Sequence, residues 1–118
     1  MKVEWIEHKS KRILYVEYSG ARNDDELIGI LHKEVQIERQ LTGKILCLVN
    51  VSDASAGRRY MQELKKLGRE VRRNKVERTA TIGVSGVKEI LFKSYIAFTG
   101  ETNKTFSSEK EARDWLVS

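Results

Sequence analysis

Residues 44–51 read KILCLVNV, and residues 52–57, SDASAG, follow them directly. The first stretch is a near-continuous apolar run of β-forming residues, which is typical of a strand covered on both faces of a sheet. The second consists of small, turn-forming residues. Apolar residues then recur at intervals of three and four from Tyr60 to Val71, which predicts a helix that ends near Asn74. The centre of the predicted fold is therefore a buried strand, a turn and a long helix.

Two strands and a helix are predicted ahead of this central strand. Apolar residues alternate with other residues in 3–8 and again in 13–18, and the polar residues between the two stretches favour a hairpin. Asn23 and Glu26 form a variant of the capping box in which Asn replaces Ser or Thr, so a helix should begin there. The apolar stripe of this helix predicts an end near residues 42–43.

Strands and helices continue to alternate in the rest of the chain. Residues 79–84 predict a strand, residues 87–98 have helical periodicity, and residues 104–106 predict a short strand. Residues 108–111 form a capping box for a last helix. This order indicates one α/β domain over residues 1–118, with a mixed sheet of four or five strands, the first two antiparallel, and four helices packed mostly on one face.

Composition limits the classes of protein to which the chain can belong. Its 118 residues are 40% hydrophobic and 33% charged, which suits a single folded domain with a sizeable core. The single cysteine excludes an intramolecular disulfide and a metal site with several cysteines. The highly charged start and the absence of a long apolar run predict a cytoplasmic protein without a transmembrane segment.

The net charge of +5 is concentrated in one segment. Residues 58–78 hold nine Lys or Arg against three Glu, a net of +6 that leaves −1 for the rest of the chain. Most of these bases lie away from the apolar stripe, so we expect a solvated basic face that either keeps the helix soluble or contacts a partner. Nucleic acid and an anionic membrane surface are further alternatives, although no aromatic residues alternate with the bases to stack on nucleobases. The predicted contact residues are Lys65, Lys66, Arg69, Arg72 and Arg73.

The turn before the basic helix is the best candidate for a modification or anion site. Helix N-termini favour anions, and Arg58 and Arg59 follow Ser55 closely. A phosphoryl group on Ser55, or on Ser52 as a second choice, would lie next to this positive charge. The alternative is that Ser55 or Asp53 is an ordinary N-cap that contributes about 1 kcal/mol. The candidate site comprises Ser52, Asp53, Ser55, Gly57, Arg58 and Arg59.

The chain resembles the STAS superfamily of anti-sigma-factor antagonists and sulphate-transporter domains. The resemblance rests on the element order, on the strand that enters a serine-bearing turn, and on the closing pattern of residues 82–100 and 105–116. The likeness is greatest to its small stand-alone bacterial branch, described as STAS/SEC14-like. In the antagonists a strand ends in Asp-Leu-Ser, and a later Asp-Ser-Ser-Gly turn presents a serine that a partner kinase phosphorylates. Residues 50–52, Asn-Val-Ser, are similar to the first element. Residues 53–57 are similar to the second, with one extra residue and without the usual stretch between the two elements.

The resemblance implies two alternative roles. The antagonist side implies a non-catalytic regulatory module that binds a protein partner, either a kinase or an anti-sigma-like regulator, and that phosphorylation at Ser55 would switch. The SEC14 side implies a small carrier of a lipid or other apolar ligand. The residues that would line its cavity, whose spacing equally fits an ordinary core, are Tyr60, Met61, Phe92, Tyr95 and Phe98.

Enzymatic and metal sites have little support in the sequence. Residues 83–87, GVSGV, lack the glycine that a nucleophile elbow needs two places after its serine. His8 and His32 have no second ligand at metal-binding spacing, and Cys47 has no neighbouring base in sequence to activate its thiol. No phosphate-binding or dinucleotide-binding motif occurs. We therefore expect no catalytic residue, no metal site and no cofactor.

The first helix is acidic, whereas the second is basic. Residues 24–39 contain five Asp or Glu against two Lys or Arg, a net of −3. Faces of opposite charge can pair between two copies of a chain across a two-fold axis. The charge pattern therefore also predicts a homodimer.

Overall fold

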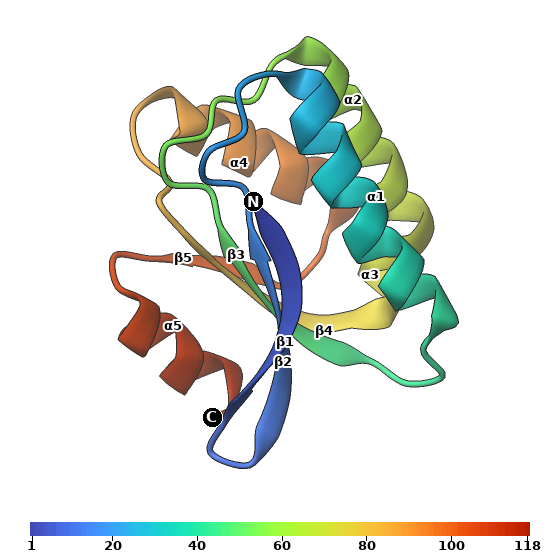
Figure 1. Cartoon of the computed structure of the whole chain (residues 1–118), viewed down its shortest axis with the longest axis vertical. Helices are drawn as coiled ribbons and strands as arrows, with labels where there is room; N and C mark the ends of the chain where they lie inside the picture. Colours follow the sequence, from blue (N-terminus) through green and yellow to red (C-terminus); the bar gives the residue numbers. More distant parts are fainter.

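The computed structural model describes residues 1–118 and contains one five-stranded sheet (Figure 1). β1 and β2 form an antiparallel hairpin, and β2, β3, β4 and β5 run parallel to one another. This mixed sheet confirms the predicted fold class and the antiparallel first pair. In their order across the sheet, the strands are β1 (Lys2–His8), β2 (Lys11–Glu17), β3 (Ile45–Asn50), β4 (Val76–Ile82) and β5 (Asn103–Phe106).

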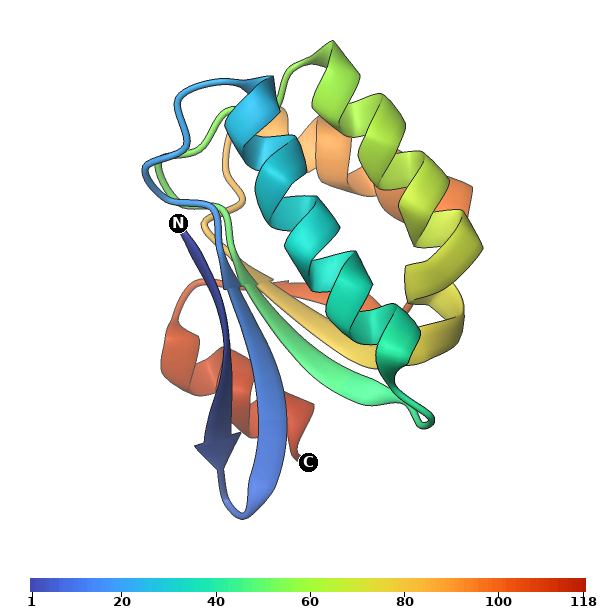
Figure 2. The same ribbon diagram turned by 45° about the vertical axis from the view of Figure 1, so that its right-hand side comes forward.

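Helices cover both faces of this sheet unequally. Three of them, α1, α2 and α4, lie on one face, and α5 lies alone on the other (Figures 1 and 2). This arrangement agrees with four helices packed mostly on one face. The helices are α1 (Asp24–Gln40), α2 (Arg58–Leu67), α4 (Val87–Thr99) and α5 (Glu109–Leu116), and a π-helical turn η1 (Gly68–Arg72) and the short α3 (Arg73–Lys75) connect α2 to β4. None of the helices has both the length and the apolar character that crossing a membrane requires.

The predicted capping boxes explain where α1 and α5 begin. Asn23 Oδ1 accepts a hydrogen bond from the backbone N–H of Glu26 at 3.0 Å, and Ser108 Oγ accepts one from that of Glu111 at 3.2 Å. In the first box, Glu26 Oε1 accepts from the N–H of Arg22 at 2.7 Å. Each cap satisfies a backbone N–H that has no partner within its own helix. The starts of these two helices are therefore encoded locally.

The core consists of two layers, one on each face of the sheet. The larger layer contains 14 buried residues beneath α1 and α2, and the smaller contains seven beneath α5. β3 contributes to both layers, since Cys47 and Val49 belong to the larger and Leu48 to the smaller. Successive side chains of a strand point to opposite faces of the sheet. The apolar run of residues 44–51 is thus a strand covered on both faces, as predicted.

The π-helical turn changes the direction of the side chains that follow α2. Its hydrogen bonds run from residue i to i+5, so one extra residue is fitted into the turn and the later side chains are rotated. Arg72 consequently points toward the sheet and is only 2% exposed, whereas Arg69 and Arg73 remain exposed. The prediction that Arg72 belongs to the solvated basic face is therefore wrong.

Of the three helices on the larger layer's face of the sheet, α4 is the least buried. Only Tyr95 and Thr99 are buried along its 13 residues, while Val87 and Ile90 are each 69% exposed. Lys65 on α2 attaches α4 through a hydrogen bond from its Nζ to Ser94 Oγ at 2.8 Å. α4 is thus a partly exposed cover over the sheet.

Candidate functional site

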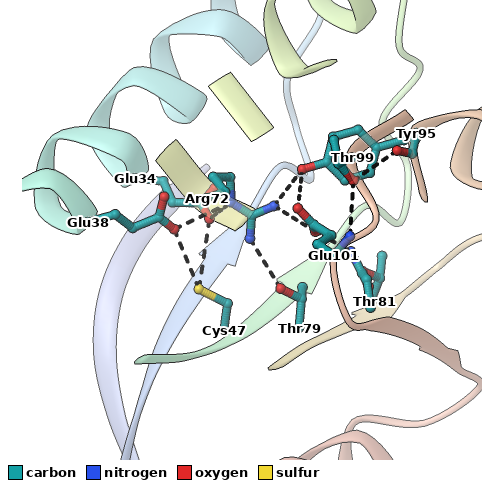
Figure 3. A network of polar contacts seen from close by, with 10 residues as sticks. Glu34, Glu38, Cys47, Arg72, Thr79, Thr81, Tyr95, Thr99 and Glu101 are labelled. Carbon is teal, nitrogen blue, oxygen red and sulfur yellow. Dashed lines mark hydrogen bonds and ion pairs between the residues drawn. The ribbon is translucent and has the colours of Figure 1, made fainter. Parts of the chain in front are cut away.

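A buried polar network lies between α1, η1, α4 and the sheet, with Arg72 at its centre (Figure 3). On the α1 side, Arg72 Nε is 2.9 Å from Glu34 Oε2 and 3.4 Å from Glu38 Oε2. The Cys47 thiol on β3 donates to Glu38 Oε2 at 3.7 Å and to Glu34 Oε2 at 3.9 Å. All four side chains are buried. Two carboxyl groups of one helix therefore hold one side of the guanidinium.

The other side of the guanidinium is held by α4 and the segment that follows it. Arg72 Nη1 donates to Tyr95 Oη at 3.1 Å and to Glu101 Oε1 at 3.2 Å, and the Tyr95 hydroxyl donates to Glu101 Oε2 at 2.6 Å. Arg72 Nη2 donates to Thr79 Oγ1 on β4 at 3.3 Å. Gly68 allows α4 to approach, because a Cβ there would overlap the Tyr95 hydroxyl. The network thus ties α1, the end of the basic segment and α4 together.

Burial and mutual charge shift the pKa values of this network. Burial, with a smaller contribution from the charge of Glu34, raises the pKa of Glu38 to about 9. The second oxygen of Glu38, Oε1, is buried without a hydrogen-bond partner, which further disfavours its charged form. Burial also raises the pKa of the Cys47 thiol well above its usual range. Burial alone would lower the pKa of Arg72, but the carboxylates of Glu34 and Glu101 more than offset this and keep it raised. At pH 7, Glu38 is protonated and Arg72 is charged.

This network was not predicted, although the amino-acid sequence contains a signal for it. Glu34 and Glu38 follow Leu27 and Leu31 by seven residues each, so they lie on the apolar stripe of α1. A charged residue on such a stripe is buried with a partner or not buried at all. Their donor atoms and that of Cys47 lie within 4.8 Å of one another, a spacing that metal ligands also have. Here the guanidinium of Arg72 lies against both carboxyl groups and supplies the positive charge.

The backbone N–H groups at the start of α2, the candidate anion site, already donate hydrogen bonds to a carboxylate of the chain itself. Asp24, in the first turn of α1, accepts hydrogen bonds from the backbone N–H of Gly57 at 2.8 Å and from that of Tyr60 at 3.1 Å. Gly57 is the N-cap residue and no side chain of the turn caps α2. The interpretation of Ser55 or Asp53 as the N-cap is therefore wrong, because a residue distant in sequence takes that role.

The two candidate serines of the turn differ in their surroundings. Ser55 is exposed. Ser52 is partly buried, its N–H donates to Asn50 Oδ1 at 2.9 Å, and its carbonyl accepts from Ser19 Oγ at 2.9 Å. Phosphorylation of either serine remains a prediction.

The basic segment is paired within the chain more than its sequence indicates. Arg59 forms an ion pair with Asp25 of α1, and Arg72 is bound by the carboxyl groups described above. Arg69 lies over the ring of Phe98 on α4, with its guanidinium 4.7 Å from the ring centroid. Lys66 and Arg73 are exposed, as predicted for the contact face. Part of the opposite charge of α1 and the basic segment is thus paired inside one chain, and the homodimer stays a prediction.

Replacing Asp24 with alanine tests this capping arrangement. Asp24→Ala removes two charge-assisted hydrogen bonds at the positive end of α2, so we expect the free energy of unfolding to fall by about 1–2 kcal/mol. Ser55→Ala, which removes an exposed hydroxyl with no capping role, should change it by less than about 0.5 kcal/mol. Urea unfolding measures both variants. A larger loss for Ser55→Ala than for Asp24→Ala would contradict the capping arrangement.

An apolar pocket of about 100 Å³ lies between the sheet, α2 and α4. Thirteen of its 18 lining residues are hydrophobic. Phe98, which the SEC14-like alternative places in the cavity, lies outside it because it packs on Arg69 at the surface and is 42% exposed. The other four residues of that prediction, Tyr60, Met61, Phe92 and Tyr95, do line the pocket. Further apolar lining residues come from β3, the turn after it, α2 and α4, and they include Val49, Val51, Ala54, Ala56, Leu64 and Leu91.

The charged residues of the pocket lie at two ends, and two neutral polar residues, Thr81 and Asn103, also line it. Glu34, Arg72 and Tyr95 belong to the buried network. At the other end, Lys88 of α4 donates from Nζ to the carbonyl of Val51 at 2.8 Å. Between these ends the pocket is mainly apolar. The pocket is thus shaped for a molecule with an apolar body.

The histidines lie outside this site. His8 Nε2 is 2.9 Å from Asp114 Oδ1 near the end of the β1–β2 hairpin, and His32 Nε2 is 2.6 Å from Glu63 Oε2 between the outer sides of α1 and α2. Neither lines the pocket. Each histidine side chain is held by its contact with a carboxylate.

Comparison with known proteins supports the architecture. No protein-family model matches the chain, and none of the curated proteins matches it. Among solved structures, it is similar to the crystal structure of an uncharacterized protein of the DUF3478 family with a SpoIIAA-like fold from Shewanella loihica PV-4. The two chains are 18% identical with a TM-score of 0.67, and the match covers 98% of this chain and 92% of that one. The chain therefore has the SpoIIAA-like, STAS-like fold that the sequence resemblance predicted.

Proposed function

We propose that this protein is a non-catalytic binding module that holds a small apolar ligand in the pocket between α2, α4 and the sheet. The observation that carries the proposal is the pocket itself, whose lining is hydrophobic at 13 of 18 positions and ends in a charged network. Small-molecule sites in proteins combine apolar walls with a few oriented polar groups in this way. Moving apolar surface from water to such walls is favourable without any covalent chemistry.

The limited burial of α4 and the glycines at its two ends support the entry of a ligand beneath it. α4 buries only two of its residues, and glycines with positive φ lie on both sides of it, Gly86 with φ 59° before and Gly100 with φ 70° after. Glycine accommodates backbone changes that other residues resist, and such positions serve as hinges when an element moves around a ligand. A helix with these properties covers a site that has to open.

The size of the pocket limits the ligand while α4 stays in this position. A cavity of about 150 Å³ admits a benzene molecule. The pocket measures about 100 Å³. It therefore has room for a chain or ring of about four to six carbons, on the same scale. This size favours a small molecule over a complete diacyl lipid.

Filling the pocket tests the proposal. Leu91 lines the pocket from α4, while its neighbour Ile90 points outward and is 69% exposed. We expect the wild type and Ile90→Trp to bind 1-hexanol, with NMR shifts confined to pocket residues, and Leu91→Trp to bind at least tenfold more weakly. Absence of binding by the wild type, or equal binding by both variants, would contradict the proposal.

A second proposal concerns regulation by a protein partner, either a kinase or an anti-sigma-like regulator. Ser55 is exposed, and its neighbours Ala54 and Ala56 both line the pocket. A phosphoryl group on Ser55 would add about −2 charge beside the pocket. Incubation with ATP and the soluble extract of the cells that make the protein, followed by phosphosite mapping, tests this. An unmodified Ser55 and Ser52 in extracts from all growth conditions would remove the proposal.

A further inference from the structure

Lys88 differs from the other charged residues of the pocket. The pocket is lined by three charged side chains, and two of them, Glu34 and Arg72, form a buried ion pair at 2.9 Å. Lys88 lies at the start of α4 and is partly buried, and no carboxylate lies within 4.0 Å of its ammonium. The ammonium at this end of the pocket therefore has no ion-pair partner within the chain.

Two backbone carbonyls fix the position of this ammonium. Lys88 Nζ donates to the carbonyl of Val51, just after β3, at 2.8 Å, and is 3.5 Å from the carbonyl of Gly83, just after β4. An ammonium has three N–H donors, so at least one is left for a ligand. The carbonyls are neutral, and they orient the charge without cancelling it. This end of the pocket thus presents a positioned cation.

The two charged ends of the pocket lie apart along β4. Arg72 contacts Thr79 in the middle of β4, whereas Lys88 contacts Gly83, four residues further along. At the rise of a parallel strand this is about 13 Å. The end at Arg72 already has the carboxylates of Glu34 and Glu101. An additional negative group therefore has its partner only at Lys88.

From this geometry we propose that the ligand of the pocket is a small amphipathic anion, an apolar body of about four to six carbons that carries a carboxylate. Lys88 binds the carboxylate, and the apolar walls bind the body. An ammonium–carboxylate hydrogen bond is roughly twice as strong as a neutral one. Lys88 is thus the residue that selects an acid over the corresponding alcohol. This inference rests on the proposed binding function of the pocket.

Two six-carbon probes, one charged and one neutral, separate the contribution of the ligand's charge to binding from that of its apolar body. Hexanoate and 1-hexanol are titrated at pH 7 into the wild type, Lys88→Met, Lys88→Arg and Lys93→Met by NMR or calorimetry. Lys93 is the control, since it is exposed on the same helix and does not line the pocket. We expect the wild type and Lys93→Met to prefer hexanoate about tenfold, which corresponds to about 1.4 kcal/mol. Lys88→Met should lose this preference and still bind 1-hexanol, and Lys88→Arg should recover it.

The outcomes distinguish this inference from the function on which it rests. Binding of 1-hexanol without a preference for hexanoate, or a preference that survives in Lys88→Met, would overturn the anion specificity and leave the binding module intact. Absence of binding by both probes would overturn both. Dodecanoate identifies the source of the anion: weaker binding than hexanoate indicates a short free acid. Tighter binding that still depends on Lys88 indicates a fatty acid whose chain displaces α4.

Discussion

Replacing Arg72 with methionine is expected to lower the free energy of unfolding by about 3–5 kcal/mol. The substitution keeps much of the apolar stem and removes the guanidinium. Glu34 and Glu101 would then remain buried without their shared cation, and the protonated Glu38 would lose a hydrogen-bond donor. Losing one partner of a buried ion pair is far more destabilising than losing a surface pair, because the remaining charge cannot be solvated.

Urea unfolding at pH 7 measures this effect, with Lys66→Met and Arg73→Met as matched controls. Both control residues belong to the same basic segment as Arg72 but are exposed, so each should change the free energy of unfolding by less than about 0.5 kcal/mol. If Arg72→Met does not fold, Arg72→Lys, which keeps a positive charge but fewer donors, should fold with reduced stability. An Arg72→Met protein within 1 kcal/mol of the wild type by this measure, or no more destabilised than the controls, would contradict a buried network.

Stability is expected to fall as the pH rises from about 5 to about 9. Burial raises the pKa of Glu38 to about 9 in the folded protein, whereas an unfolded Glu titrates near 4.3. Between these values the folded state holds a proton that the unfolded chain has released, so raising the pH favours unfolding. The contribution of Glu38 is fully present below the unfolded pKa and is lost progressively up to the folded one. Its slope is about 1.4 kcal/mol per pH unit.

Glu38→Gln isolates this contribution, because an amide resembles the protonated carboxyl group and does not titrate. We expect the variant to match the wild type near pH 5 and to exceed its free energy of unfolding by about 2–4 kcal/mol at pH 8. Glu70→Gln, at an exposed position of η1, is the control and should keep the wild-type pH dependence. Parallel pH profiles for Glu38→Gln and the wild type would show that Glu38 is ionised in the folded protein.

The elements that the sequence predicted well are encoded by neighbouring residues. The apolar run of residues 44–51 by itself indicates a buried strand. The caps at Asn23 and Ser108 accept hydrogen bonds from backbone N–H groups only three residues away. Periodicity and capping are local signals, so they remain visible without the fold.

The candidate site was less predictable because it depends on contacts between distant segments. Asp24 caps α2 across 33 residues of sequence, which no local pattern reveals. Arg72 has helical spacing with exposed bases, but the π-helical turn rotates it inward. The pocket depends on how closely α4 packs on α2, which is set by side chains such as Tyr95 and by the absence of one at Gly68. Sequence alone therefore indicated its lining residues but not whether a space remains between them.

Native mass spectrometry of the purified protein, mixed with a small-molecule extract of the cells that make it, tests the binding-module proposal most directly. We predict that the wild type and Ile90→Trp acquire the same added mass, that denaturation releases it, and that Leu91→Trp does not acquire it. The wild type without any added mass, or the same added mass on all three proteins, would contradict the proposal that the pocket beneath α4 binds a ligand.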